Sequence, residues 1–564
     1  MPEPAAGANP PPAEPVEASE AGEAGETTSK KAAKKAEAKA KKEAEKARRA
    51  AERAAAQAAT SAQAAEDHAV DHYGQRTHET KLDGLDVSLK DLTESHVGKK
   101  ILLRTFLQNS RMQGAKMVFV ELREEGSWAI QGIAAANAEG TVSKQMVKWI
   151  GSVNAESFVI VEATVQKPLE PVKSVRVSNL ELHITRFFVI AAAPAVLGMT
   201  LATANKAVSN FSDEDTVEEK AEKLSIAEPA GVPAASMITH LDNIVLHKRA
   251  PVQQAIADIR MEAKELFRSY LREKGFKEFE PPSLIGAASE GGANVFDLKY
   301  FGQSAFLAQS PQFYKQIEIA GGRKRVFSVS PVFRAENSNT PRHMTEFTGL
   351  DLEMEIKDSY TEVLDVLEGV LIHIFRELEK RCSYEIELVR SVYPSEKFLL
   401  PEPGKAVRLT FAEGQKLLRE EGPEEFRNVS DDEDMSTPQE KALGALIRKK
   451  FNTDFYTLDK FPESARPFYA KEDPTNPKVT NAYEVLSGGQ RINNPEELEA
   501  RLRKKGVDPA SPGIKEYVDV FRQAGVPDHG GGGIGLDRVV SWYLGLPSVH
   551  LAAYYPRTPK RLTP

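Results

Sequence analysis

The spacing of apolar residues in the C-terminal part of the chain switches between two periods. In VQQAIADIRMEAKELFRSYLREKGF, residues 252–276, apolar residues recur every three to four positions, which predicts a long amphipathic helix. Further on, Leu350, Leu352 and Met354 alternate with acidic residues, which predicts a strand with one apolar and one charged face. Such helices, interleaved with antiparallel strands, predict a large α+β domain over residues 251–564.

A hairpin is predicted in the middle of this domain. A β-branched and aromatic run at 326–333 leads into the polar loop RAENSNTPRHMTEF, and the second strand follows. By the period of two, Arg334 and Glu336 share a face of the first strand, while Phe347 and Asp351 share a face of the second. Cations and carboxylates on one sheet surface predict a site for a polar ligand.

Between about residues 86 and 190 the pattern is that of short strands separated by turns. The five runs are ILLRTFLQ, MVFVEL, SWAIQGI, SFVIVEATV and LELHITRFFVI, with the amphipathic helix VSKQMVKWIGSV between the third and the fourth. This order predicts a Greek-key barrel of the OB-fold type, which binds oligonucleotides, although a small barrel without a ligand has the same pattern. Residues 191–250, with the acidic SDEDTVEEKAEKL, are predicted to be a hinge or linker.

Composition indicates the size class of the protein and the cellular compartment in which it is expected. With 564 residues, 41% of them hydrophobic, the chain can form more than one domain. No apolar run approaches the ~20 residues of a membrane span, and the N-terminus has no apolar signal core. Cys382 is the only cysteine, which excludes an internal disulfide and a cysteine-rich zinc site. These features predict a cytoplasmic protein without a membrane anchor.

Charge is distributed unevenly along the chain. The net charge is -8, but residues 29–53 hold eleven Lys or Arg against four Glu, a local charge of +7. Residues 1–28 have no basic residue and too few apolar residues to fold, so 1–85 is predicted to be a disordered and Lys-rich helical extension. Three alternatives remain for the basic segment: a solvated helix, a helix that forms on a polyanion, or a solubilising tail. DNA binding is not expected.

Three stretches of the large domain occur in a fixed order. The first is FKEFEPPSLIGAASEGG, which follows the long helix, the second is the hairpin, and the third is GGGGIGLDRVVSWYLGL. Singly each signal is weak, because a glycine run is more often a turn and an Arg-x-Glu on a strand is more often a salt bridge. Together and in this order they resemble the three signature motifs of the class II aminoacyl-tRNA synthetases.

The resemblance implies an ATP site and a homodimer with Pro282 at its interface. Arg334 would hold the α-phosphate, since a planar guanidinium binds two oxygens at once, and Arg538 the γ-phosphate. Gly530–Gly533 would let a nucleotide lie flat against the backbone. The implied ATP-binding set is Arg334, Glu336, His343, Phe347, Glu484, Ser487, Gly533, Gly535 and Arg538, of which Arg334, Arg538 and Glu484 are catalytic and Glu484 would also bind Mg²⁺.

Three further stretches point to the amino acid. SEGGANVF, QSPQFYKQ and LSGGQRI are similar to the aspartyl-tRNA synthetases of eukaryotic and archaeal type, and the ending YPRTPKRLTP is similar to the eukaryotic cytosolic members. Lys315 and Arg491 would then hold the aspartate side chain, because two desolvated cations disfavour the nearly isosteric but neutral asparagine. The implied aspartate-binding set is Ser289, Glu290, Gln312, Lys315, Asp351, Ser487 and Arg491, with Gln312 and Asp351 directed at the amino group.

The same resemblance implies tRNA(Asp) as a partner. Barrel positions that would read the anticodon are Arg111, Phe119, Gln131 and Glu181, since an aromatic side chain stacks an unpaired base and Gln and Glu read base edges. Alternation alone leaves a core position as the alternative for Phe119. In the extension, sequence-independent affinity for the tRNA backbone would come from Lys30, Lys31, Lys34 and Lys35.

Other readings of the sequence stay open. Asparaginyl- and lysyl-tRNA synthetases share the barrel and hairpin, but a lysyl enzyme needs carboxylates facing an ammonium and an asparaginyl enzyme has little use for Lys315. A different class of function is a synthetase-derived RNA-binding or regulatory protein with weak or no turnover. The segment NPKVTNAYEVLSGGQR is about seven residues shorter than in the family, so that only Glu484 remains of two Mg²⁺-binding carboxylates, and an exposed sheet edge is expected there.

Overall fold

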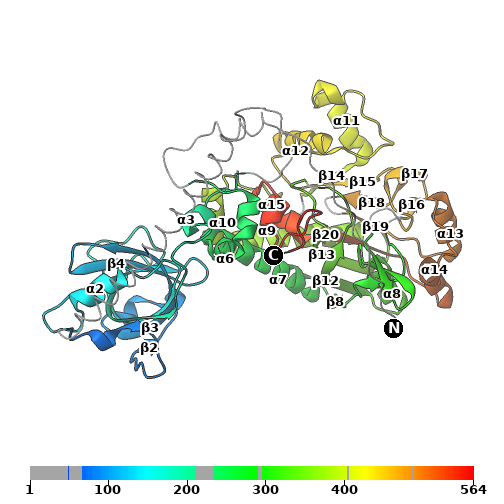
Figure 1. Ribbon diagram of the computed structural model, residues 1–564. Coiled ribbons are helices and arrows are strands. Elements are labelled where there is room, and N and C mark those ends of the chain that lie inside the picture. Colours follow the sequence, from blue (N-terminus) through cyan, green and yellow to red (C-terminus); the bar gives the residue numbers. More distant parts are fainter. Residues whose placement is uncertain are drawn as a thin grey trace, which may run out of the picture. The chain divides into compact units, whose positions relative to one another are not determined.

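The structure is a computed structural model, and it describes residues 49, 67–209, 233–289, 295–338, 340–402, 405–484 and 487–563. The predicted backbone-binding lysines Lys30, Lys31, Lys34 and Lys35 and the predicted loop residue Glu290 lie outside these ranges. The described residues form two compact units, of which one contains residues up to Leu122, Ile130–Val172 and Ser178–Ala193, and the other contains Arg123–Ala129, Lys173–Val177 and residues from Pro194 onward (Figure 1). No helix within the described ranges is long and apolar enough to cross a membrane.

The smaller unit is a β-barrel. Its elements are β1 (Tyr73–Gln75), β2 (Leu85–Asp86), β3 (Lys100–Met112), β4 (Met117–Arg123), β5 (Ala129–Ala135), α2 (Lys144–Ile150), β6 (Phe158–Gln166) and β7 (Glu181–Ala191). The barrel closes because β6 pairs with both β3 and β7, while β7, β5, β4 and β3 follow one another in the sheet. The five predicted runs are the five strands β3 to β7 of this described part, and α2 lies between β5 and β6 as expected. The predicted barrel is therefore confirmed.

The larger unit is built on a sheet that has eight strands in the described part of the chain. From edge to edge the order is β14 (Val407–Thr410), β15 (Tyr456–Asp459), β18 (Ala482–Glu484), β19 (Ser487–Gln490), β20 (His529–Gly535), β13 (Glu346–Glu355), β12 (Arg325–Phe333) and β8 (Lys277–Glu278). Neighbours run antiparallel except in the edge pairs β14–β15 and β12–β8. Two small sheets contain β9 (Leu284–Ile285), β10 (Asp297–Tyr300) and β11 (Gln303–Leu307), and β16 (Glu472–Asp473) and β17 (Asn476–Thr480).

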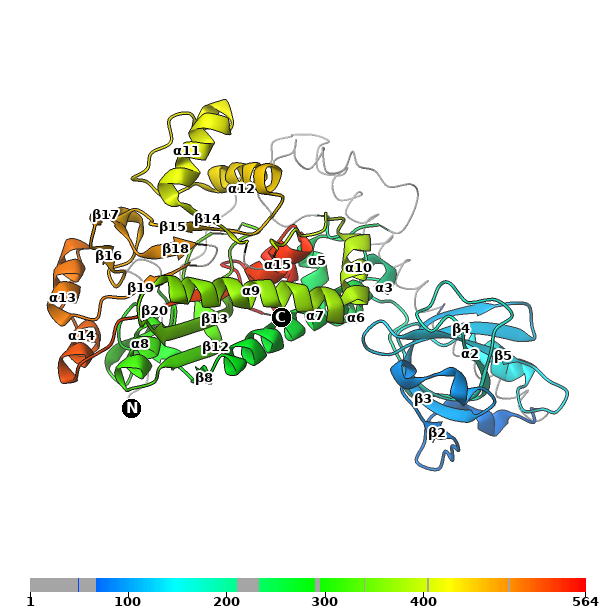
Figure 2. The same cartoon turned by 180° about the vertical axis from the view of Figure 1, so that it is seen from behind.

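Helices bury the apolar face of this sheet, and Figure 2 shows α7 and α9 running along it. In the described part of the larger unit the α-helices are α3 (Leu201–Ala204), α5 (Met237–Asp242), α6 (Ile244–Arg249), α7 (Pro251–Glu273), α8 (Gln312–Ala320), α9 (Thr361–Arg381), α10 (Ser383–Val392), α11 (Phe411–Glu421), α12 (Thr437–Phe451), α13 (Pro495–Lys504), α14 (Ile514–Gln523) and α15 (Leu536–Leu544). Leu352 of β13 shares one core cluster with Leu266 of α7 and Leu371 of α9. The alternate residues of β13 therefore lie on the opposite face, as the charged stripe predicted.

Two expectations about the strands need correction. Strand β12 ends at Phe333, so Arg334 and Glu336 lie in the hairpin loop and not on a strand face; Arg334 still continues the ladder by donating its amide hydrogen to the Thr345 carbonyl at 2.9 Å. The expected exposed sheet edge at the shortened segment was also wrong. Strand β18 pairs with β15 on one side and β19 on the other, and β19 pairs onward with β20, so the sheet remains continuous there.

Candidate active site

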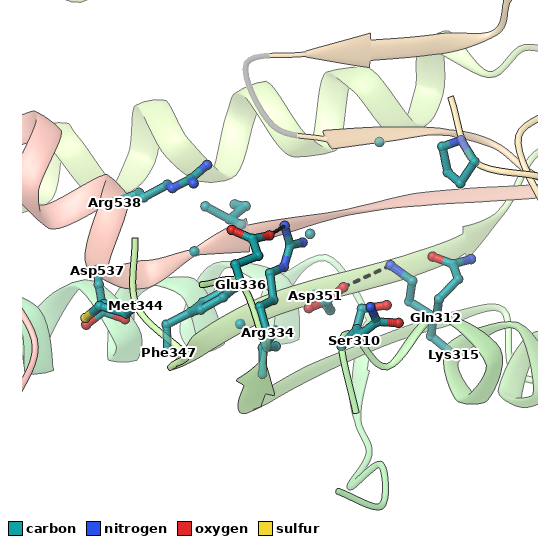
Figure 3. A pocket seen from close by; sticks show the side chains of 18 of the residues that line it. Ser310, Gln312, Lys315, Arg334, Glu336, Met344, Phe347, Asp351, Asp537 and Arg538 are labelled. Atoms are coloured by element: carbon teal, nitrogen blue, oxygen red, sulfur yellow. Dashed lines mark hydrogen bonds and ion pairs between the residues drawn. The ribbon is translucent and has the colours of Figure 1, made fainter. Parts of the chain in front are cut away.

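A pocket of about 210 Å³ lies over the charged face of β13 (Figure 3). It is lined from α8, the hairpin loop, β13, β20 and the start of α15, which are far apart in the sequence. The predicted site residues that line it are Gln312, Lys315, Arg334, Glu336, His343, Phe347, Asp351, Arg491, Gly533, Gly535 and Arg538. The fold thus assembles one site from the second and third sequence motifs and from two of the stretches thought to select the amino acid, 309–316 and 486–492, while the described residues of the first motif and of 289–296 contribute no lining residue.

One end of the pocket is rich in guanidinium groups. Burial lowers the pKa of Arg538, and the nearby charge of Arg334 lowers it further. Glu336 offsets part of this positive charge, with its Oε1 at 3.8 Å from Arg334 Nη1 and its Oε2 at 3.8 Å from His343 Nε2. The Arg334 guanidinium lies 5.7 Å from the centre of the Phe347 ring. Two partly desolvated cations beside an aromatic ring form a suitable site for the phosphates and base of a nucleotide.

A buried ion pair fixes the start of α15, where Arg538 lies. Arg260 of α7 donates from Nε to Asp537 Oδ1 at 3.1 Å and from Nη2 to Thr348 Oγ1 at 2.9 Å. Asp537 Oδ2 in turn accepts from the Thr348 amide at 3.2 Å. These bonds join α7, β13 and α15 at the site, so the backbone next to Arg538 is held in place before any ligand binds.

At the other end of the pocket, two buried cations are already paired with two buried carboxylates. Lys315 Nζ lies 3.0 Å from Asp351 Oδ1 and 3.5 Å from Glu353 Oε2, and Arg491 Nε lies 3.0 Å from Glu353 Oε1. Burial acts to raise the pKa of Glu353, but Arg491 and Lys315 outweigh it and the pKa is lowered. Arg491 also donates to the Gly531 carbonyl at 3.0 Å. The four charges balance, so the site is ready to exchange one carboxylate for that of a ligand.

The glycine run has two different roles. A side chain at Gly531 would collide with the Leu352 carbonyl and the Glu353 carboxylate, and one at Gly530 would lie 2.8 Å from the Gly489 carbonyl. These two glycines therefore allow the neighbouring strands to approach, and they do not line the pocket. Gly533 and Gly535 do line it.

The remaining predicted residues are placed as follows. Ser289 is buried with its Oγ 3.3 Å from that of Ser310, a lining residue. Ser487 lies opposite Gly533 in the sheet register. Glu484 is not among the lining residues; its Oε2 accepts from Nη2 of Arg466, which does line the pocket, at 2.8 Å. Pro282 is exposed.

The four barrel positions form two pairs on strands that follow one another in the sheet. Arg111 of β3 lies over the ring of Phe119 of β4 at 5.4 Å, and Gln131 of β5 donates to Glu181 of β7 at 3.4 Å. Phe119 is half-buried between the buried Val118 and Val120, so its ring lies outside the barrel core. The core alternative for Phe119 was wrong.

Glu353 is the main charged residue that the sequence analysis missed. It has the same parity as Asp351 on a strand already predicted to have a charged face, and that signal was sufficient to find it. Gln309 and Ser310, which open the quoted stretch QSPQFYKQ, also line the pocket, as do Arg466 and Tyr469, which no motif or spacing marks. Among the described residues, no cluster of three or more His, Cys, Asp or Glu side chains is arranged to hold a metal ion.

Known proteins are similar to this chain in both sequence and architecture. The family described as tRNA synthetases class II (D, K and N) matches residues 236–559. The cytoplasmic aspartate–tRNA ligase of Homo sapiens is 41% identical over 493 residues, covering 86% of this chain and 93% of that one. The structure of the aspartyl-tRNA synthetase from Entamoeba histolytica has a TM-score of 0.75 at 35% identity, with 87% of this chain and 96% of that chain covered. The asparaginyl-tRNA synthetase from Pyrococcus horikoshii complexed with asparaginyl-adenylate has a TM-score of 0.68 at 26% identity, with 86% and 100% covered.

Proposed function

The chain belongs to the class II tRNA synthetases of the D, K and N group, and we propose that it is an aspartate–tRNA ligase. In this function it activates L-aspartate with ATP, forming aspartyl-adenylate and pyrophosphate, and transfers the aspartyl group to tRNA(Asp). The named relatives support aspartate, and their cytoplasmic names support the same compartment for this chain.

The observation that supports aspartate most directly is the buried cluster at one end of the pocket. Lys315 and Arg491 offer two cations for a side-chain carboxylate, and Asp351 offers one carboxylate for the α-ammonium group. A lysine substrate would bring its side-chain ammonium towards these two cations. An asparagine substrate would bring no charge to replace Glu353 or Asp351 as their partner. Of the three amino acids, only aspartate has both a side-chain carboxylate for the two cations and an α-ammonium group for Asp351.

The chemistry follows from positioning and charge. Attack of the aspartate α-carboxylate on the α-phosphorus of ATP forms the mixed anhydride and releases pyrophosphate, and no proton transfer by the protein is needed. Arg334 and Arg538 would stabilise the charge on the phosphate oxygens. The chain's own residues thus align the two substrates and neutralise charge.

ATP fits the guanidinium end of the pocket, and Mg²⁺ fits it only together with the ATP phosphates. Glu484 is the one predicted metal ligand, and it is bound to Arg466 in this structure. Bound Mg²⁺ would supply charge neutralisation at the phosphates, for which one carboxylate plus phosphate oxygens is a usual ligand set. The barrel pairs Arg111–Phe119 and Gln131–Glu181 would bind the anticodon, and Pro282 would lie in a homodimer interface.

The proposal is tested by exchange of labelled pyrophosphate into ATP. Aspartate should support exchange, whereas asparagine and lysine at the same concentration should not. Arg334→Ala should abolish exchange while the protein remains folded, because the α-phosphate loses its guanidinium. A folded wild-type chain that shows no aspartate-dependent exchange would contradict the proposal and favour an RNA-binding protein without turnover.

A further inference from the structure

A row of buried, hydrogen-bonded side chains, Gln312, Gln316 and His529, leads away from the pocket. Gln316 of α8 and His529 of β20 are both fully buried, and neither lines the pocket. Gln312, one helical turn before Gln316, is 2% exposed and does line it. In Figure 3, Gln312 and Lys315 both project from α8 towards the pocket. The side chain of Gln316 therefore contacts a lining side chain at Gln312, while the His529 backbone carbonyl accepts from the amide of Arg491, another lining residue, at 2.9 Å.

The hydrogen bonds of this row have a single consistent direction. His529 Nδ1 lies 2.8 Å from the Pro527 carbonyl, which can only accept, so Nδ1 holds the proton and Nε2 is an acceptor. Gln316 Nε2 lies 2.9 Å from His529 Nε2 and therefore donates to it. This turns Gln316 Oε1 the other way, where it accepts from Gln312 Nε2 at 2.7 Å and from the Tyr517 hydroxyl at 2.7 Å. Burial also lowers the pKa of His529, which favours the neutral ring.

We propose that Gln316 and His529 are positioning residues that fix the amide of Gln312, so that its Oε1 faces the pocket and accepts from the α-ammonium group of the amino acid. The proposal rests on the proposed function, and it explains how the contact between Gln312 and the α-ammonium group of the substrate is oriented. If the Gln312 amide were inverted, its NH₂ group would face the ammonium and repel it. The network opposes that inversion, because it would bring the Gln312 Oε1 against Gln316 Oε1, two acceptors without a hydrogen between them, and the far end of the row is fixed by a backbone carbonyl.

The variant that tests this is Gln316→Met, which keeps the length of the side chain and removes every hydrogen bond. Gln415→Met is the matched control, since Gln415 of α11 is also buried and donates to the Ser430 carbonyl at 2.8 Å, remote from the pocket. We expect the KM for aspartate in pyrophosphate exchange to rise roughly tenfold in Gln316→Met and to stay within about twofold in the control. The KM for ATP should be unchanged in both.

Succinate separates positioning from general damage to the pocket. It has both carboxylates of aspartate and no ammonium group, so its inhibition constant should be the same in Gln316→Met and in the wild type. In a Gln312→Met background, adding Gln316→Met should have no further effect on the KM for aspartate. If Gln316→Met does not fold, His529→Phe replaces it, because it keeps the ring that stacks on Phe521 and removes the Nε2 acceptor.

The outcomes are distinct. An unchanged KM for aspartate in a folded variant, or an equal loss of affinity for succinate, would overturn the positioning role while leaving the proposed function intact. A wild-type chain without aspartate-dependent exchange would overturn the proposed function and this inference with it.

Discussion

Replacing Lys315 by methionine should remove much of the preference for aspartate over asparagine. The Lys315 side chain is 2% exposed, and its Nζ lies 3.0 Å from Asp351 Oδ1 and 3.5 Å from Glu353 Oε2. A hydrogen bond to a charged group in such a place contributes about 1.5–3 kcal/mol. Since 1.4 kcal/mol is about tenfold, the aspartate-to-asparagine ratio of kcat/KM should fall by about 10- to 150-fold. Asparagine has no charge to lose, so its own kcat/KM should change little.

The same substitution should also destabilise the protein. Without Lys315, the buried Asp351 carboxylate loses the cation with which it is paired, while Glu353 keeps Arg491. Breaking a buried ion pair by removing one partner costs about 3–5 kcal/mol, so folding must be checked by urea unfolding before the kinetics are interpreted. Lys460→Met is the matched control, because Lys460 Nζ pairs with Asp473 at 2.8 Å outside the pocket lining.

The assay is pyrophosphate exchange with aspartate and asparagine measured in parallel, together with the KM for ATP. In Lys315→Met the KM for ATP should stay close to that of the wild type, since the proposed phosphate-binding guanidinium groups of Arg334 and Arg538 lie at the other end of the pocket. The Lys460→Met ratio should equal the wild-type ratio. An unchanged ratio in folded Lys315→Met would refute the assignment of this cluster to the substrate side chain.

Three further predictions concern other parts of the chain. Removing residues 1–60 should weaken tRNA binding in a salt-dependent way and leave pyrophosphate exchange unchanged; equal affinity at low salt would show that the basic segment only solubilises the protein. Because Glu484 is paired with Arg466, this chain should need more Mg²⁺ for exchange and activate aspartate less well than a version with the family's longer hairpin, and identical Mg²⁺ titrations would contradict this. Burial lowers the pKa of His240 to about 4 and that of His247 to about 3. Below pH ~6.5 the unfolded chain therefore binds more protons than the folded chain. The free energy of unfolding should fall as the pH drops, by about 2 kcal/mol from each ring at pH 5. Urea unfolding at pH 7.5 and pH 5 of the wild type and of His240→Leu/His247→Leu would check this, with equal pH dependence counting against it.

Local sequence patterns were sufficient to predict the long helix and the strands of the hairpin and to propose most of the charged residues that line the pocket. The period of two in residues 350–354 predicted which face of β13 is buried, because successive side chains on a strand must point to opposite sides. The long helix predicted at 252–276 is α7, and its apolar stripe packs as expected. Motif order placed Arg334 and Arg538 in one predicted ATP site, and the stretch QSPQFYKQ placed Lys315 in the predicted aspartate site.

What the sequence did not determine depends on partners that are distant along the chain. Glu353 neutralises Lys315 from another element and Arg491 from more than a hundred positions away, so the two cations assigned to the aspartate side chain are already paired within the protein. The collision of a side chain at Gly531 with Leu352 and Glu353 exists only because β20 and β13 are neighbours in the sheet. Charge balance, the direction of hydrogen bonds and steric room are properties of atoms in contact, and contact between distant segments is decided only when the sheet forms.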